Sequence, residues 1–98
     1  MDLSINEGTL VVSGGPGDSP QNAIVLRKTP RGLSAAGAEH MLLQKWFGER
    51  GKAWTLVRQE LIQAGGRIYD LYEVALSDGS TRHLYFDVTE WLSRLGSA

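Results

Sequence analysis

The segment Arg67–Asp87, RIYDLYEVALSDGSTRHLYFD, constrains the fold more than any other part of the chain. Two runs rich in aromatic and aliphatic residues flank Ser77-Asp78-Gly79-Ser80. Asp-Gly between such runs is a strong hairpin signal, because glycine accepts a positive φ without steric cost. A third run of strand type, Trp54–Gln63, precedes the hairpin and is joined to it through Ala64-Gly65-Gly66. The sequence therefore predicts a three-stranded antiparallel meander.

Two registers of the hairpin compete. A two-residue Asp78-Gly79 turn would pair Leu76 with Thr81, whereas a three-residue loop, 77–79, would pair Leu76 with Ser80. A slip of one residue moves every side chain to the other face of the sheet. We prefer the three-residue loop, because it gathers the apolar side chains on one face with Asp70 and Arg82 as the only charges. That face then carries Ile68, Tyr72, Val74, Leu76, Leu84, Phe86 and Val88.

Two short apolar runs near the start, Thr9–Ser13 and Ala23–Arg27, indicate an N-terminal pair of strands. The segment between them, Gly14–Pro20, holds three glycines and two prolines among its seven residues, GGPGDSP, and predicts an exposed, mobile connector. A phosphate-binding loop would need a following Lys-Ser/Thr pair and a helix. Here no lysine follows and the next element has strand character, so we favour the connector.

One long helix is predicted over Ser34–Phe47, with Ser34 as its N-cap and Gly48 ending it. Its apolar stripe has helical spacing, and Glu39, Gln44 and Lys45 are expected to lie off that stripe. A short C-terminal helix follows the hairpin, capped by Asp87 or Thr89. The expected stripe consists of Ala35, Ala38, Leu42 and Trp46, widened by Leu43 and Phe47.

The predicted order is strand, strand, long helix, three strands and short helix. This order favours an α+β fold, with the N-terminal strand pair and the meander forming an antiparallel sheet and the long helix packed on one face. The 98 residues suit a single domain, 1–98. The helix stripe and the apolar hairpin face would cover each other.

Composition narrows the classes of function. With ten basic and eleven acidic residues, the net charge is −1, and no basic cluster suited to nucleic acid or an anionic membrane is evident. The chain has no cysteine, which excludes disulfides and thiolate chemistry. No apolar run approaches the roughly 20 residues that span a bilayer, and MDLSINEGT lacks the features of a secretory signal. We expect a cytoplasmic protein without nucleic-acid or membrane partners.

The later half also carries a pattern of turn and packing residues: Glu39, Phe47-Gly48, Gly51, Trp54, Gln59, Gly65-Gly66, Tyr69-Asp70, Asp78-Gly79 and Tyr85-Phe86-Asp87. In this pattern the chain resembles small stand-alone bacterial proteins of uncharacterised function. The helix followed by a meander is similar, more loosely, to PepSY-type and cystatin-like domains, which are mostly inhibitory or binding modules. The resemblance implies a bacterial α+β protein and carries over no site residues.

The hairpin face opposite the apolar one is the first candidate site. A carboxylate opposite an imidazole, as Glu73 would be opposite His83, suits a general base. A solvated face with cross-strand charge pairs, or a protein contact, is the more common arrangement. Because tyrosine is enriched at interfaces, we interpret this face as an interaction surface. Its residues are Tyr69, Glu73, His83, Tyr85 and Asp87.

The charges on the apolar face are the second candidate site. Buried charges need partners, so Asp70 and Arg82 either pair, lie at the sheet margin, or join Tyr72 in binding a small ligand between helix and sheet. His40 and His83 are far apart in sequence, and their surroundings do not match zinc-ligand spacing. We expect no metal and no cofactor.

Three functional hypotheses follow. The first is a non-enzymatic protein-interaction module, self-associating as a homodimer or binding another protein. The second is a small-ligand-binding domain that uses Asp70, Tyr72 and Arg82. The third and weakest is a hydrolase or isomerase that uses His83 with Glu73 or Asp87.

Overall fold

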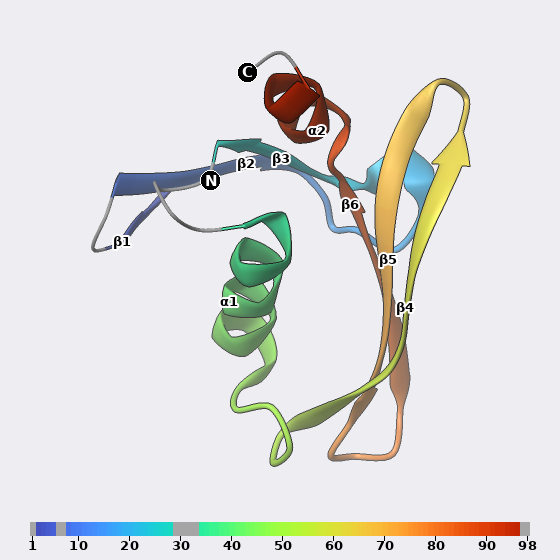
Figure 1. The fold of residues 1–98 in the computed structure, drawn as a ribbon. Coiled ribbons are helices and arrows are strands. Elements are labelled where there is room, and N and C mark those ends of the chain that lie inside the picture. The colour runs from blue at the N-terminus through green and yellow to red at the C-terminus, as the bar shows by residue number, and fades with distance from the viewer. Residues whose placement is uncertain (1, 6–7, 29–33, 97–98) are drawn as a thin grey trace.

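The computed structural model describes residues 2–5, 8–28 and 34–96. Within these residues the chain forms one six-stranded sheet in the order β1-β2-β3-β6-β5-β4, together with helices η1, α1 and α2 (Figure 1). The strands are β1 Asp2–Ile5, β2 Gly8–Gly14, β3 Ile24–Lys28, β4 Trp54–Ala64, β5 Arg67–Leu76 and β6 Thr81–Asp87. The helices are η1 Pro20–Asn22, α1 Ala35–Phe47 and α2 Thr89–Gly96.

The α+β class is confirmed, but the sheet is not wholly antiparallel, and its strand order differs from the predicted N-terminal pair plus meander. The sequence analysis missed β1, which pairs with β2. The N-terminal strands also continue the sheet, because β3 runs parallel to β6, with Ile24 opposite Phe86 and Val25 opposite Asp87. This junction gives hydrogen-bond partners to the side of β6 that faces away from β5. Such parallel pairing between distant segments leaves no local signal in the sequence.

The predicted register of the central hairpin is confirmed. Leu76 N–H donates to Ser80 C=O at 2.8 Å, and Gly79 adopts a positive φ of 89°. The N–H and hydroxyl of Ser80 both donate to the Asp78 carboxylate, and these bonds lower the pKa of Asp78. Glu73 therefore lies opposite His83, as the three-residue loop requires.

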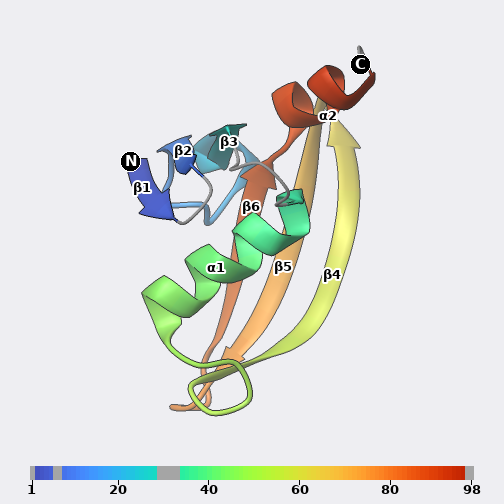
Figure 2. The same cartoon turned by 60° about the vertical axis from the view of Figure 1, so that its left-hand side comes forward.

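The main core lies between α1 and the face of β4–β6 that curves around it (Figure 2). Ser34 caps α1 as predicted, accepting from Gly37 N–H at 3.0 Å. Two expectations about α1 were wrong: Trp46 is 36% exposed, and Glu39 is fully buried. Glu39 stands four residues from both Ala35 and Leu43, so it shares their face of the helix. The most deeply buried core side chains are Leu26, Ala38, Leu42, Leu43, Trp54, Tyr72, Val74 and Phe86.

The segment after β2 was predicted to be an exposed, mobile connector; Gly14, Pro16 and Asp18 are exposed, but Gly17 is packed against β6. Gly17 is buried, its N–H donates to Asn22 C=O at 2.7 Å, and its C=O accepts from Tyr85 N–H at 2.7 Å. A Cβ at Gly17 would lie 2.8 Å from Ile24 Cδ1, at a φ of +97°. Glycine at this position therefore lets the connector lie directly against β6.

Candidate functional site

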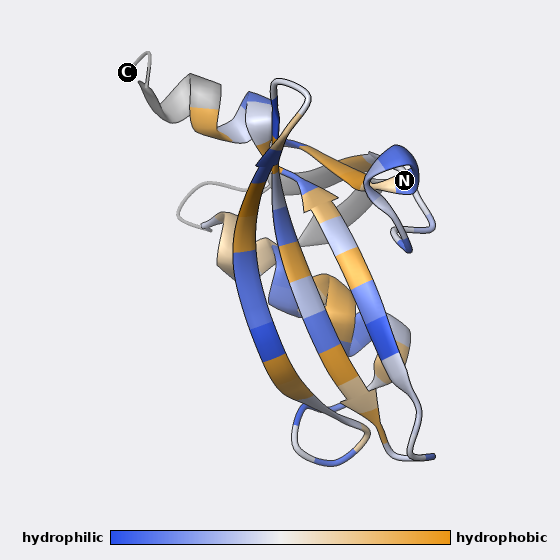
Figure 3. Ribbon diagram, turned by 90° about the vertical axis from the view of Figure 1, so that its right-hand side faces the viewer, coloured by the Kyte–Doolittle hydropathy of each residue, from blue (hydrophilic) through white to orange (hydrophobic). Residues whose placement is uncertain are grey.

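The predicted interaction face lies on the side of β4–β6 away from α1, and Figure 3 looks onto it. The Glu73 carboxylate lies 3.6 Å from His83 Nε2 and 3.3 Å from Arg58 Nε. Arg58 also contacts Glu60 at 2.9 Å. Because Glu73 is shared between two basic side chains and the His83 side chain is half exposed, the group forms a surface charge network. This geometry favours contact over the general-base hypothesis.

Two residues assigned to that face have structural partners instead. Asp87 is only 6% exposed, binds Arg67 at 2.9 Å and accepts from Thr89 N–H at 3.1 Å, so it caps α2. Tyr69 is 8% exposed and meets Tyr85 edge to face, with ring centroids 6.4 Å apart. The open part of the face is therefore centred on Glu73, His83 and Arg58.

The predicted ligand site is split by the structure. Arg82 is exposed and lies opposite Val74, whereas Asp70 lies opposite Phe86, four residues further along β6. Arg82 lines a hollow of about 290 Å³ that also includes Asp18 and His83. Asp70 and Tyr72 point to the α1 side, and the partner they meet there is Glu39.

Glu39 and Tyr72 are fully buried beneath α1 and form an acidic cluster with the half-buried Asp70. Tyr72 Oη donates to Glu39 Oε1 at 3.0 Å, while Glu39 Oε2 has no hydrogen-bond donor. Burial, followed by the neighbouring Asp70 carboxyl, raises the pKa of Glu39 to about 10. A proton on Glu39 removes the repulsion between the two carboxylates, since Oε2–H can then donate to the Asp70 carboxyl. Burial and the nearby Glu39 also raise the pKa of Tyr72 above its ordinary value.

Aromatic and basic side chains border this cluster. The His40 ring meets the Tyr72 ring edge to face at 5.6 Å, and its Nε2 lies 3.3 Å from Arg50. Its Nδ1 lies 2.9 Å from Ala36 C=O, so the consistent assignment has Nδ1 donating and Nε2 accepting from Arg50. The Arg50 guanidinium lies 5.8 Å from the Trp54 ring. With Glu39 protonated and hydrogen-bonded to Tyr72, this pair acts as a polar part of the core.

Another candidate surface is β4, which is the edge strand of the sheet next to β5. Apart from an isolated bridge between Trp54 and Arg50 at its start, no residue of the described chain pairs with its outer side. Val57 is 55% and Leu61 59% exposed, which makes them two of the large apolar side chains that the described structure leaves open. A bulge at Val57, between Leu56 and Arg58, interrupts the pairing with β5. Beyond it, the strand runs regularly to Ala64.

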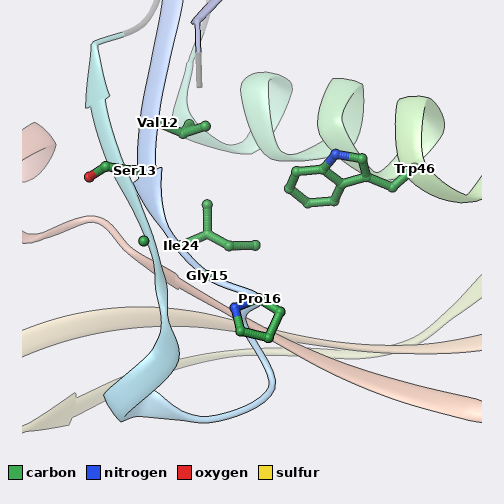
Figure 4. Close-up of a pocket in the computed structure, with 7 residues that line it drawn as sticks. Val12, Ser13, Gly15, Pro16, Ile24 and Trp46 are labelled. Atoms are coloured by element: carbon green, nitrogen blue, oxygen red, sulfur yellow. The ribbon is translucent and has the colours of Figure 1, made fainter.

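The last candidate site is a groove of about 470 Å³ beside Trp46 (Figure 4). Val12, Pro16 and Ile24 supply apolar walls, and the segment 13–15 adds backbone polar groups. The Trp46 ring stacks on Phe86 at 6.4 Å with an interplanar angle of 5°. Sequence reasoning missed this groove because it assigned Trp46 to the core.

Comparisons with known proteins give no match: no protein-family model, curated protein or solved structure matches the chain. The resemblance drawn from the sequence therefore stays a prediction. Across the described ranges, no helix is long and apolar enough to cross a membrane. In the same part of the chain, no group of three or more His, Cys, Asp or Glu side chains is placed to hold a metal ion.

Proposed function

We propose that the protein is a non-enzymatic, self-associating interaction module whose contact surface is the free edge of β4. The observation that carries the proposal is the exposure of Val57 and Leu61 on a strand whose outer side is unpaired. An exposed strand edge is a template for another strand. Large apolar side chains at such an edge mark interaction sites more often than scattered surface positions do.

The charge network of Arg58, Glu60 and Glu73 lies beside this edge. The β4 edge with these charges replaces the predicted tyrosine-rich face as the proposed contact surface, because Tyr69 and Asp87 on that face are buried. Natural proteins often protect edge strands with charged side chains, proline, bulges or short length. β4 has a bulge at Val57 and charges at Arg58 and Glu60, but it is 11 residues long, contains no proline and pairs regularly from Arg58 to Ala64. These features support strand pairing at β4 as the protein's mode of interaction.

Size-exclusion chromatography with light scattering over a wide concentration range tests the proposal. The expected mass at high concentration is twice the 10.7 kDa of one chain. Leu61→Lys should shift the protein towards monomer, because it places a charge on the edge, whereas Ser77→Lys in the distant β5–β6 turn should not. A wild-type protein that stays monomeric throughout, or a Leu61→Lys variant that associates like wild type, would contradict the proposal.

A second candidate function is small-ligand binding, at the Trp46 groove instead of at Asp70, Tyr72 and Arg82. The observation that favours it is a cavity bordered by a partly exposed indole ring and by apolar walls. Such a site suits a planar aromatic compound. The test is titration with a panel of planar aromatic compounds while the Trp46 indole N–H resonance is followed by NMR. If no compound moves that resonance, the ligand hypothesis fails.

A further inference from the structure

The sequence of β4 around Gln59 has apolar residues two positions away on either side and opposite charges one position away. The segment Val57–Leu61 reads apolar, cation, amide, anion, apolar: VRQEL. When two copies of a strand pair antiparallel around a two-fold axis, residues equally far from the centre lie opposite each other. In such a pair, the cation of each strand lies opposite the anion of the other.

We infer that β4 pairs antiparallel with β4 of a second copy, with Gln59 on the two-fold axis and Arg58 opposite the partner's Glu60. This inference rests on the proposed function and adds the arrangement of the two chains and the residues that determine recognition. In this register the regular part of β4 around Gln59 pairs with its copy, and the partner's Leu61 comes to the bulge at Val57, where regular pairing ends. Each dimer then contains two Arg58–Glu60 pairs.

The backbone of β4 is suited to this pairing. Ala64 and Arg67 flank a two-residue turn in which Gly65 and Gly66 have φ values of 59° and 76°, so the flanking residues bond to each other. Bonded and non-bonded residues alternate along an antiparallel pair. The peptide groups of Gln59, Leu61 and Gln63 therefore point to the free side, where a partner strand can bond to them.

Charge selects the register. Arg58 and Glu60 project from the same face, since they form an ion pair at 2.9 Å, and both side chains are about half exposed. Side chains directly opposite each other across a strand pair lie within contact distance, and like charges there are destabilising. Centring the axis on Glu60 would place two glutamates opposite each other. Centring it on Leu61 would place Arg58 opposite Ala64 and Glu60 opposite Ile62, without a charge partner.

Complementary single variants test the inference in solution. Arg58→Glu alone would set glutamate against Glu60 across the interface, and Glu60→Arg alone would set arginine against Arg58. Each should be at least tenfold weaker as a dimer than wild type. Mixed together, the two variants should form a heterodimer, because one chain then presents two anions and the other two cations. Native mass spectrometry of the mixture, with circular dichroism of each variant to verify folding, gives the result.

A cross-linking measurement tests the register without altering these charges. Because the chain has no cysteine, Gln59→Cys introduces a single thiol on the proposed axis. Mild oxidation should give a disulfide-linked dimer, whereas Leu61→Cys, which would come to the bulge at the partner's Val57, should cross-link far less. This register is overturned if the mixture of Arg58→Glu and Glu60→Arg chains stays monomeric, or if Leu61→Cys cross-links faster than Gln59→Cys. A wild-type protein that nevertheless dimerises with sensitivity to Leu61→Lys leaves the proposed function standing.

Discussion

At the scale of single residues, Glu39 shows how a fold imposes a protonation state. Its carboxyl is buried beneath α1 with one oxygen bound by Tyr72 and the other facing Asp70. Two ionised carboxylates in one buried site would repel and would lack solvation. The proton stays on Glu39 because that state satisfies both neighbours. The consequence is a stability that depends on pH.

We predict that Glu39 makes the protein less stable as pH rises. The pKa of Glu39 is about 10 in the folded protein against an ordinary value of 4.5, so between these values only the folded state keeps the proton. The free energy of unfolding should then fall by up to about 1.4 kcal/mol per pH unit. Glu39→Gln, which mimics the neutral acid, should remove this slope and be more stable than wild type at pH 8. Urea unfolding from pH 5 to pH 9 measures the slope.

The control for this prediction is Glu49→Gln, which neutralises an exposed carboxylate at the end of the same helix. It should keep the wild-type slope. A Glu39→Gln variant whose stability changes with pH as wild type does would refute the assignment of the proton to Glu39.

A second prediction at the residue scale concerns Gly17. Gly17→Ala would combine a strained positive φ with a Cβ 2.8 Å from Ile24 Cδ1. We expect a loss of about 2 to 3 kcal/mol in the free energy of unfolding. Gly51→Ala is the matched control, because Gly51 has a φ of +88° with open space around it, and should cost less. Equal losses in thermal melts of the two variants would show that packing against Ile24 contributes nothing.

At the scale of elements, local signals predicted what local interactions decide. Ser34 and Gly48 marked the ends of α1, and Asp78-Gly79 with the apolar alternation gave the hairpin register and hence the Glu73–His83 pair. The parallel contact of β3 with β6 was out of reach, because nothing near Ile24 or Phe86 specifies its distant partner. Which strand ends the sheet was equally hidden, so the exposed Leu61 was not recognised as part of a site.

Asp87 carries the third prediction. The sequence analysis offered it both as a cap of the C-terminal helix and as part of a contact face, and the structure supports the cap: its carboxylate accepts from the backbone N–H and hydroxyl of Thr89 and pairs with Arg67. Asp87→Ala should cost about 2 kcal/mol in the free energy of unfolding, because the N-terminus of α2 loses its acceptor. Asp87→Asn keeps an acceptor oxygen and should lose roughly half as much. Urea denaturation compares them, and equal losses would assign the effect to the charge and not to the cap.

At the scale of the whole molecule, the described sheet ends in two edge strands, β1 and β4, and β4 borders the main core. The connector 15–19 and β3 pair with the inner side of β6, and α1 covers the core face of β4–β6. The outer side of β4 has no such cover in the described chain. Because the β4 edge carries Arg58 and Glu60 in a self-complementary order, we propose a second copy of the chain as the partner at that edge.

Thermal stability should therefore depend on protein concentration. A dimer that unfolds to separate chains gains about 1.4 kcal/mol per mole of dimer for each tenfold rise in concentration, which for a chain of this size raises Tm by about 3 °C. Leu61→Lys should abolish this dependence, because a charged edge no longer pairs, and Ser77→Lys should keep it. Differential scanning calorimetry across two decades of concentration measures the shift. A wild-type Tm that stays constant over that range would mean that the β4 edge binds no second copy, since mass action requires any association confined to the folded state to raise Tm.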